Sequence, residues 1–486
     1  MNKQSKIAIL GFGDEGKALL KYLKKHKYPN ITVCDKNVDI KHGMPAGVSV
    51  NLGKDYLNDL DKFEVVFRSP GVKFLEPQVQ LAIKAGSYVT SVSDYFMDQC
   101  PCPVIGVTGT KGKGTTSTLI YLMLKKKYKH VWLGGNIGEP PITFLDKLKG
   151  DSIAVLELSS FQLQDIRKSP HYVVFLNTTT DHLDYHVDRD EYMQAKEQIL
   201  THQNKKSVAV FNKDYEYSKY YIPLTKGTVK LVSKQVAVKN GAFVKDGTIY
   251  YIRGGKTEKI ADVKEVALIG SHNLENIMPA LTIAKEFGVN TKGIREVVKT
   301  FKGLPNRLEF VKEVKGVKYY NDSYSTTPET SMAAVDSFDC PTLLIAGGHD
   351  KGLNYDDWAI KILTKESLRT VVLIGNTADK MESALIEAEK KLGGEAGSTH
   401  GPLGLVVTPT KILKRPDLEE AVLEAYAETT PGWVVVMSPA AASFDQFKNY
   451  KERGEKFRQL VNVLRGKLKI FMRWFNNFWD GFFRFS

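Results

Sequence analysis

The segment Gly106–Ser117 combines a glycine-rich turn, a lysine and several hydroxyl groups. It reads GVTGTKGKGTTS, follows a short apolar run and precedes a helix-like segment. Backbone N–H groups at the start of a helix bind phosphate oxygens, and Lys113 can neutralise their charge. Gly109 and Gly112 permit a close approach of the backbone. The pattern favours a nucleotide phosphate site over the alternative, a flexible turn before a helix.

The residue after Lys113 is Gly114, where the common P-loop has the Ser or Thr that binds magnesium. Glycine has no side-chain ligand, but Thr115 and Thr116 follow directly. We therefore expect the hydroxyl of Thr115 to take over the metal.

Acidic and imidazole side chains follow two further strand-like segments. Glu157 ends the apolar run SIAVLE, at the sheet edge where ligands bind in parallel α/β folds. A second run leads into Asp181, His182, Asp184 and His186. Oxygen ligands with an imidazole suit magnesium or manganese better than zinc. The alternatives are a solvated strand end for Glu157 and a capping or hydrogen-bonding role for the others.

A second glycine motif, GFGDEGKA, spans Gly11–Ala18 and has the G-x-G-x-x-G spacing. Asp35 ends the next strand-like segment, as in dinucleotide-binding folds. The motif fits NAD, the diphosphate of another nucleotide, or a tight turn without a ligand. Nothing else in the chain indicates hydride chemistry, which disfavours NAD.

Alternating strand-like and helix-like segments must position these residues. They occur in three successive blocks, and paired glycine turns between Val236 and Ile260 indicate a meander of hairpins. The class is therefore α/β with parallel sheets. We expect domains at 1–97, 98–304 and 305–466, and an aromatic, basic tail at 467–486.

Bulk composition fits an ordinary globular protein of several domains: 486 residues, 25% charged and 42% hydrophobic. The net charge of +13 suits acidic small molecules, nucleic acid or an anionic membrane and cannot choose among them. The four cysteines are too scattered for a disulfide framework. No apolar stretch is long enough to span a bilayer, so we expect an intracellular protein.

Taken together, the motifs resemble those of the Mur ligases, ATP-dependent amide-forming enzymes of peptidoglycan precursor synthesis. The resemblance runs from about Lys6 to Arg465 and favours the glutamate-adding branch. It rests on SPGV, GTKGKGTT, GGNIG, LELSSFQL, TTDHLD, HNLEN, GLPNRLE, NDS, GGHDKG and SPAAASFDQFKNY, in this order.

The resemblance implies three domains: an N-terminal Rossmann-like domain for a nucleotide sugar, a central P-loop domain with a small β-meander, and a C-terminal Rossmann-like domain. It implies that the carboxylate of UDP-N-acetylmuramoyl-L-alanine attacks the γ-phosphate of ATP. The amine of D-glutamate then attacks the acyl phosphate and releases phosphate.

It also implies the site residues. Those expected to bind ATP are Gly109, Thr110, Lys111, Gly112, Lys113, Gly114, Thr115, Thr116, Asn273, Asn276, Arg307 and Asp322. Two magnesium sites are expected, replaceable by manganese, with Thr115 and Glu157 at one and His182 at the other. Lys196 matches a lysine that is carbamylated in the family and can then bind metal. Lys113, Glu157, His182 and Lys196 form the implied catalytic set.

The substrate residues follow in the same way. The UDP part is expected at Gly11, Gly13, Asp35, Ser69, Gly71 and Asn136, and the amino acid at Thr326, Lys351, Ser443 and Tyr450. The chain departs from the family at Tyr324, where a lysine is expected to meet the acidic side chain. Loss of that charge-assisted contact weakens the assignment of glutamate.

Other readings concern the acceptor, the catalysis and the tail. A folylpolyglutamate-type ligase is the main alternative, but such ligases lack the N-terminal GFGDEG…SPGV domain. A non-catalytic scaffold predicts loss of Lys113, Glu157 and His182, which are all present.

The tail has a spacing typical of an interfacial helix or of one packed against protein. We expect a cytoplasmic monomer that does not bind nucleic acid, with peripheral membrane or protein contact through the tail.

Overall fold

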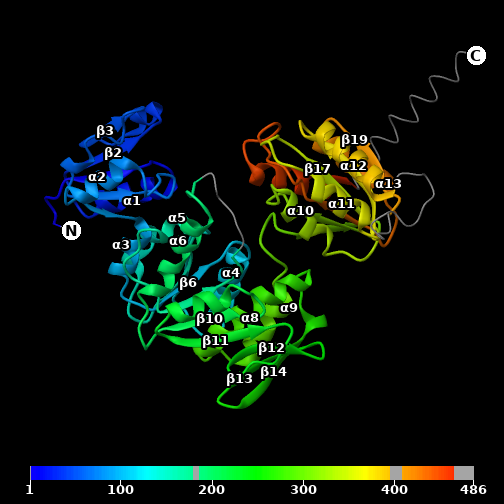
Figure 1. Ribbon diagram of the computed structural model, residues 1–486, viewed down its shortest axis with the longest axis horizontal. Coiled ribbons are helices and arrows are strands. Elements are labelled where there is room, and N and C mark those ends of the chain that lie inside the picture. The colour runs from blue at the N-terminus through cyan, green and yellow to red at the C-terminus, as the bar shows by residue number, and fades with distance from the viewer. Residues whose placement is uncertain (1, 179–184, 394–407, 465–486) are drawn as a thin grey trace, which may run out of the picture. The chain divides into compact units, whose positions relative to one another are not determined.

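The computed structural model describes residues 2–178, 185–393 and 408–464. The chain divides into two compact units, residues 1–267 with 272–301, and residues 268–271 with 302–486. Its sheets are mainly parallel and are flanked by helices (Figure 1). This confirms the α/β class predicted from the sequence.

The first unit begins with a five-stranded parallel sheet in the order β3-β2-β1-β4-β5. Its strands are β1 (Ile7–Leu10), β2 (Ile31–Asp35), β3 (Val48–Leu52), β4 (Val65–Arg68) and β5 (Tyr88–Thr90). Its α-helices are α1 (Asp14–Lys25), α2 (Pro77–Lys84) and α3 (Val92–Gln99), and its 3₁₀ helices, labelled η, are η1 (Val38–Gly43) and η2 (Leu60–Lys62). The strand order reverses between β1 and β4, so the loops after these strands border the crevice where such sheets bind ligands.

A nine-stranded sheet follows in the same unit, in the order β14-β13-β12-β11-β10-β9-β6-β8-β7. Its parallel part consists of β6 (Val104–Thr108), β7 (Val131–Gly135), β8 (Ile153–Glu157), β9 (Tyr172–Phe175), β10 (Val208–Asn212) and β11 (Thr228–Ser233). The predicted meander is β12 (Gly241–Lys245), β13 (Thr248–Arg253) and β14 (Lys256–Asp262), which are adjacent in Figure 1. Strand β12 pairs in parallel with β11, and the meander is antiparallel.

Helices cover this sheet and complete the core. They are α4 (Lys113–Leu124), η3 (Pro141–Thr143), η4 (Leu145–Lys147), α5 (Ser160–Leu163), α6 (Arg189–Thr201), α7 (Ser218–Tyr221), η5 (Ile222–Leu224), η6 (Val263–Glu265), η7 (Ser271–Asn273), α8 (Leu274–Glu286) and α9 (Thr291–Thr300). One hydrophobic core continues from the first sheet into this one, and the Phe96 and Phe144 rings meet in it at 5.5 Å. The two sheets therefore belong to one packed body.

The second unit contains a six-stranded sheet in the order β15-β16-β20-β17-β18-β19. Its strands are β15 (Glu309–Val314), β16 (Val317–Asn321), β17 (Thr342–Gly347), β18 (Leu368–Ile374), β19 (Lys411–Lys414) and β20 (Val434–Met437). Its helices are α10 (Pro328–Val335), α11 (Asp356–Thr364), α12 (Ala378–Gly393) and α13 (Leu418–Glu428), and residues 450–464 are also helical. Only β15 runs antiparallel to its neighbour, so the loops after β16, β20 and β17 meet at one sheet edge.

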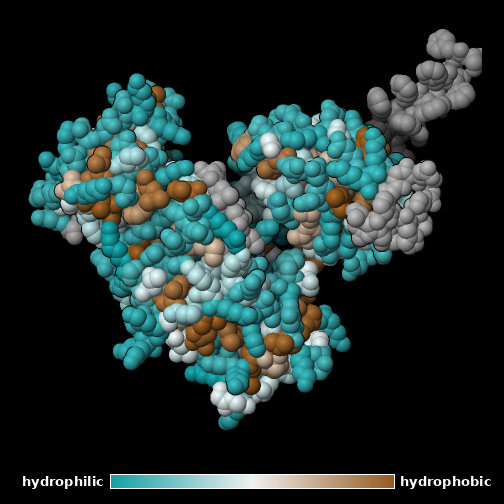
Figure 2. Space-filling model, viewed as in Figure 1, coloured by the Kyte–Doolittle hydropathy of each residue, from teal (hydrophilic) through white to brown (hydrophobic). Residues whose placement is uncertain are grey.

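The visible surface is mostly hydrophilic, with hydrophobic residues in small groups (Figure 2). Within the described residues, no helix combines the length and apolar character needed to cross a bilayer. All four cysteines are free thiols.

Candidate active site

The predicted phosphate loop joins β6 to α4 in the middle of the nine-stranded sheet. Helix α4 begins at Lys113, directly after Gly112, which has a φ of +85°. A Cβ on Gly112 would lie 2.2 Å from Oδ1 of Asn276, and one on Gly109 would lie 2.7 Å from Cβ of Leu176. Both positions therefore require glycine, and the N-terminus of α4, the end of a helix that attracts anions, lies at this loop.

Two lysines converge on this loop. The Nζ atom of Lys113 donates to the carbonyl oxygens of Gly109 (3.1 Å) and Thr110 (2.9 Å). The Nζ atom of Lys196, from α6, donates to the same Gly109 oxygen at 3.0 Å. Lys196 is buried, with 1% of its surface exposed, unlike most lysines on a helix, whose charge is solvated. Two ammonium groups at one carbonyl create a positive centre suited to phosphate.

Glu157 ends β8, the strand beside β6, and is 3% exposed. Its Oε1 atom accepts a hydrogen bond from Nδ2 of Asn136 (3.1 Å), and its backbone oxygen accepts one from the Asn136 N–H (2.9 Å). The carboxylate is therefore buried and oriented, unlike a solvated strand end. Asn136, expected at the substrate, lies beside this predicted metal ligand.

The asparagines of the HNLEN segment reach the same loop. Oδ1 of Asn276 accepts a hydrogen bond from Oγ1 of Thr116 (3.3 Å), and Nδ2 of Asn276 donates to Oδ1 of Asn273 (2.8 Å). Thr115, at the predicted metal position, is buried with 8% exposure. The structure thus brings Asn273 and Asn276, which the family resemblance assigns to ATP, to the phosphate loop.

The predicted UDP residues other than Asn136 lie at the edge of the first sheet. Gly11 has a φ of +84°, and its carbonyl accepts a hydrogen bond from the Ser69 hydroxyl at 2.9 Å. The Asp35 carboxylate accepts from the N–H groups of Phe12 (2.6 Å) and Asn37 (2.8 Å). A Cβ on Gly13 or Gly71 would contact no atom within 4 Å, so these glycines are not required by packing.

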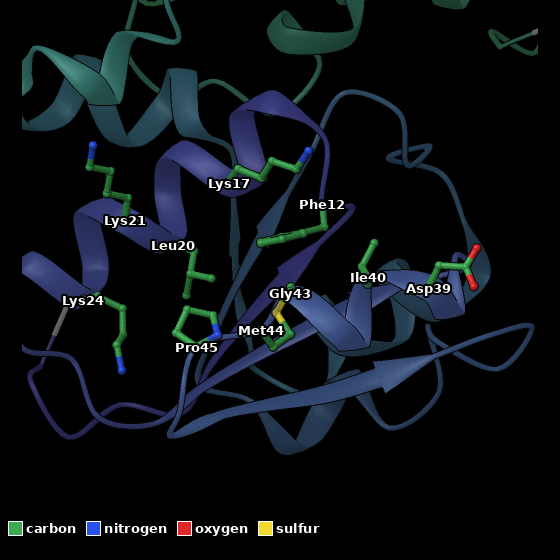
Figure 3. A pocket seen from close by; sticks show the side chains of 10 residues that line it. All are labelled: Phe12, Lys17, Leu20, Lys21, Lys24, Asp39, Ile40, Gly43, Met44 and Pro45. Carbon is green, nitrogen blue, oxygen red and sulfur yellow. The ribbon is translucent and has the colours of Figure 1, made fainter.

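A pocket of about 670 Å³ lies between α1 and η1, beside the loop that contains Phe12 (Figure 3). In Figure 3, Phe12, Leu20 and Met44 lie in the space between the two helices, whereas Lys21 points away from it. The lining residues are Phe12, Lys17, Leu20, Lys21, Lys24, Asp39, Ile40, Gly43, Met44 and Pro45. The pocket is apolar within and basic along α1.

Arg68 is a residue that the sequence reasoning missed. It ends β4, directly before the SPGV segment, and its side chain is fully buried. It donates to Oδ2 of Asp165 (2.9 Å), the Val72 oxygen (2.8 Å), the Phe161 oxygen (2.7 Å) and the Tyr185 hydroxyl (3.1 Å). Arg68 therefore ties the substrate loop of the first sheet to the segment after Glu157. The sequence signal that could have identified Arg68 is a charged residue at the end of an otherwise apolar strand, VVFR.

His186 belongs to the acidic and imidazole cluster predicted from the sequence. Its Nδ1 atom lies 2.6 Å from Oε2 of Glu191 and its Nε2 atom lies 2.9 Å from Oγ of Ser160. The ring is 2% exposed. For His186 the structure supports the hydrogen-bonding alternative. Asp181, His182 and Asp184 lie outside the described residues, as does the tail at 467–486.

In the second unit, Asp322 is the central buried acid. Its carboxylate accepts from the Ser438 hydroxyl (2.7 Å) and the Leu308 N–H (3.1 Å). Burial raises the pKa of Asp322 to about 6, against the opposing effect of Ser325, Ser438, the Leu308 N–H and Arg307. Asp322 thus fixes the loop that carries Arg307, both predicted to contact ATP.

Of the predicted amino-acid residues, Thr326, Lys351 and Ser443 lie on the loops after β16, β17 and β20, and Tyr450 begins the helix at 450–464. The Ser323 hydroxyl donates to the Tyr450 carbonyl (2.8 Å), and the Lys351 ammonium lies 5.4 Å from the centre of the Phe444 ring, next to Ser443. Thr326 follows Ser325, whose carbonyl accepts from the Ala440 N–H at 3.0 Å. One sheet edge therefore carries all of these residues.

A buried arginine holds these loops together, and it too was missed. Arg453 donates to the Ser323 hydroxyl and carbonyl (both 3.0 Å) and to the carbonyls of Ala441 (3.1 Å) and Ala442 (3.0 Å). Burial lowers the pKa of Arg453 to about 10, which leaves it charged at neutral pH. It connects the loop after β16 with the loop after β20.

Family models match three successive parts of the chain. They describe a Mur ligase MurD-like N-terminal domain (residues 5–91), a Mur ligase middle domain (107–284) and a Mur ligase glutamate ligase domain (306–441). Together they confirm the predicted three-part organisation.

Curated relatives match almost the full length of the chain. The UDP-N-acetylmuramoylalanine–D-glutamate ligase of Acetivibrio thermocellus is 38% identical over 95% of this chain and 97% of its own. Those of Clostridium tetani (36%; 94% and 97%) and Symbiobacterium thermophilum (35%; 95% and 98%) are similar. A solved MurF ligase of Thermotoga maritima in complex with ADP shares the fold, with TM-score 0.55 and 18% identity over 95% of this chain and 97% of that one. The chain belongs to the Mur ligase family.

Proposed function

We propose that the chain joins D-glutamate to UDP-N-acetylmuramoyl-L-alanine with the cleavage of ATP to ADP and phosphate. The three relatives reported above carry this activity in their names. The single observation in the structure that carries the proposal is the phosphate loop, where Lys113 and Lys196 bond the same carbonyl oxygen beside buried Glu157.

The reaction requires two anions to meet. A carboxylate oxygen of the acceptor attacks the γ-phosphorus of ATP and ADP leaves, which gives an acyl phosphate. The amine of the amino acid then attacks the acyl carbon, loses a proton and expels phosphate, so that an amide forms. Lys113 and the first-turn N–H groups of α4 offset the charge that opposes the first attack.

The oxygen donors at this loop fit magnesium. Magnesium is usually held by one or two carboxylates together with substrate phosphates and water. Glu157 supplies a buried carboxylate and Thr115 a hydroxyl, and manganese accepts the same ligands. Within the described part of the chain no group of three His, Cys, Asp or Glu forms a metal site, and phosphate oxygens and water would complete the coordination beside these two side chains. Bound there, the ion would neutralise phosphate charge. The second site, at His182, stays a prediction.

Lys196 is suited to carbamylation. Addition of CO₂ to its neutral amine, with loss of a proton, replaces a buried positive charge near Lys113 with a negative one. This change relieves the repulsion between two ammonium groups and supplies a further oxygen ligand. A carbamate ¹³C resonance after incubation with ¹³C-bicarbonate, absent in Lys196→Ala, tests the proposal; equal spectra would contradict it.

We propose that the nucleotide sugar binds at the first sheet. Gly11, Asp35 and Ser69 border the crevice between β1 and β4, and the pocket of Figure 3 adjoins their loop.

We place the protein in the cytoplasm, where ATP and nucleotide sugars occur, as a monomer. Light scattering tests the monomer, and vesicle sedimentation with and without residues 467–486 tests membrane contact.

The decisive experiment measures phosphate release by the purified chain with ATP and UDP-N-acetylmuramoyl-L-alanine. D-Glutamate is compared with L-glutamate, D-aspartate and other amino acids, and a folate acceptor tests the alternative ligase. We expect release only with the UDP acceptor and D-glutamate, and its loss in Lys113→Ala with the fold retained. Turnover with another amino acid alone would overturn the substrate, and full activity of Lys113→Ala would overturn the role of the loop.

A further inference from the structure

Arg307 and Tyr324 form a stacked pair in the second unit. The Cζ atom of Arg307 lies 3.7 Å from the centre of the Tyr324 ring, well within the range of cation–π contacts. Tyr324 occupies the position where the family resemblance implies a lysine. The Arg307 guanidinium therefore supplies a positive charge next to position 324, from the loop before β15.

The backbone on both sides of Arg307 is held in an uncommon conformation. Asn306 and Leu308 have φ values of +64° and +43°, which non-glycine residues rarely adopt. Hydrogen bonds maintain it: Oδ1 of Asn306 accepts from Nδ2 of Asn321 (2.9 Å), and the Leu308 N–H donates to Asp322 (3.1 Å). The loop thus fixes the Cα of Arg307 and leaves its long side chain to be placed by another contact.

The ring of Tyr324 provides that contact. Among the described residues, no carboxylate lies within salt-bridge distance of Arg307. The ring itself is fixed, because the Tyr324 N–H donates to the Asn306 carbonyl (3.0 Å) and the ring meets Tyr450 edge-on at 5.0 Å and 88°. The guanidinium is held by a flat face that takes none of its hydrogen-bond donors, so these can bind an anion.

We propose that Tyr324 is a positioning residue that presents the Arg307 guanidinium to a phosphate of ATP. The proposal rests on the proposed function for the identity of the anion. Stacking restricts the side chain before the substrate binds and so lowers the entropy lost on binding. The chain thereby keeps a cation at this place without a lysine at position 324.

The competing role for Tyr324 is direct binding of the amino acid through its hydroxyl. The two roles predict different losses. Tyr324→Phe keeps the ring and removes the hydroxyl, whereas Tyr324→Leu removes both. A positioning role acts through Arg307, so Tyr324→Leu must have no effect once Arg307 is replaced.

The test is a double-mutant cycle on the full chain with Tyr324→Leu, Arg307→Gln and both together. We expect Tyr324→Leu to lower kcat/KM for ATP about 10-fold, with KM for D-glutamate within about 2-fold, which corresponds to the loss of an ordered cation contact. Tyr324→Phe should retain most of kcat/KM. In the Arg307→Gln background, Tyr324→Leu should change kcat/KM for ATP by less than about 2-fold.

Tyr426→Leu is the matched control, because it removes another cation–π pair of the same unit, in which Lys315 lies 4.8 Å from the ring. This pair adjoins the turn between β15 and β16, at the opposite end of β16 from the Arg307 pair. The kcat/KM of Tyr426→Leu for ATP should stay within about 2-fold of the wild-type value. A comparable loss in Tyr426→Leu would mean that loss of any such pair lowers activity, and would overturn the proposal.

Three other outcomes would overturn it: equal losses for Tyr324→Leu with and without Arg307, equal losses for Tyr324→Phe and Tyr324→Leu, or a loss confined to KM for D-glutamate. Calorimetric titration with Mg-ATP repeats the cycle without turnover. If wild type forms no product with D-glutamate, the proposed function fails. The Mg-ATP titration still decides the role of Tyr324, because a loss of ATP affinity that depends on Arg307 supports it and an independent loss contradicts it.

Discussion

Gly112 offers a direct test of the phosphate-loop geometry. Alanine at this position must adopt a φ of +85°, which costs about 1–2 kcal/mol for a residue with a Cβ. The added Cβ would also lie 2.2 Å from Oδ1 of Asn276 and displace the amide that bonds Thr116 and Asn273. Loss of those hydrogen bonds adds about 1 kcal/mol. We therefore expect Gly112→Ala to lower the free energy of unfolding of the first unit by about 2–3 kcal/mol.

Urea denaturation of the ligand-free chain measures this change. Gly13→Ala is the matched control, because Gly13 has a φ of −71° and its Cβ would contact nothing within 4 Å, so its stability should change little. In an Asn276→Ala background the clash is absent, and Gly112→Ala should cost only the backbone contribution. A loss in Gly112→Ala no larger than in Gly13→Ala would refute the reasoning.

Two further predictions concern buried charges. Asp165→Asn leaves the buried Arg68 guanidinium without its counter-charge and should destabilise the first unit by about 3 kcal/mol in urea denaturation. The control, Asp59→Asn, breaks an exposed pair with Lys62 and should cause no measurable change in stability. Equal effects of the two substitutions would contradict the role of burial. Asp322 has a folded pKa of about 6 against an ordinary value of 3.8, so the folded state holds more protons between these values and gains stability as pH falls through this window. Between pH 8 and pH 5 the gain is about 1 kcal/mol, and it should vanish from the pH profile of Asp322→Asn; the same profile for both proteins would show that Asp322 does not titrate there.

The sequence predicted the elements that are buried and continuous. Runs such as VIGVT and TLLIAG are apolar throughout and became the central strands β6 and β17. The edge strands β15 and β19 have the sequences EFVKEV and KILK, whose charges are allowed by one-sided exposure and interrupt the apolar run that would indicate a strand. Local periodicity therefore identifies strands in the middle of a sheet better than strands at its edge.

Site residues were predictable where a motif carries them and not where a distant partner defines them. The sequence identified Gly112, but not that its φ and the nearby Asn276 exclude any side chain. It gave no sign that Arg68 pairs with a residue 97 positions away, or that Lys196 is buried. Such facts depend on tertiary contacts that no local pattern encodes. The boundaries predicted at residues 97, 304 and 466, and the roles of individual residues, stay predictions.

The buried pair of Arg68 and Asp165 has a practical consequence for dissecting the molecule. A fragment that stops at residue 97 would retain the arginine but lose its carboxylate and the Phe161 carbonyl, while Phe96 would lose the ring of Phe144. Such a fragment would carry an uncompensated cation and an open apolar face, and we expect it to aggregate when expressed alone. Substrate-binding studies of the amino-terminal sheet therefore need a chain that extends through the nine-stranded one.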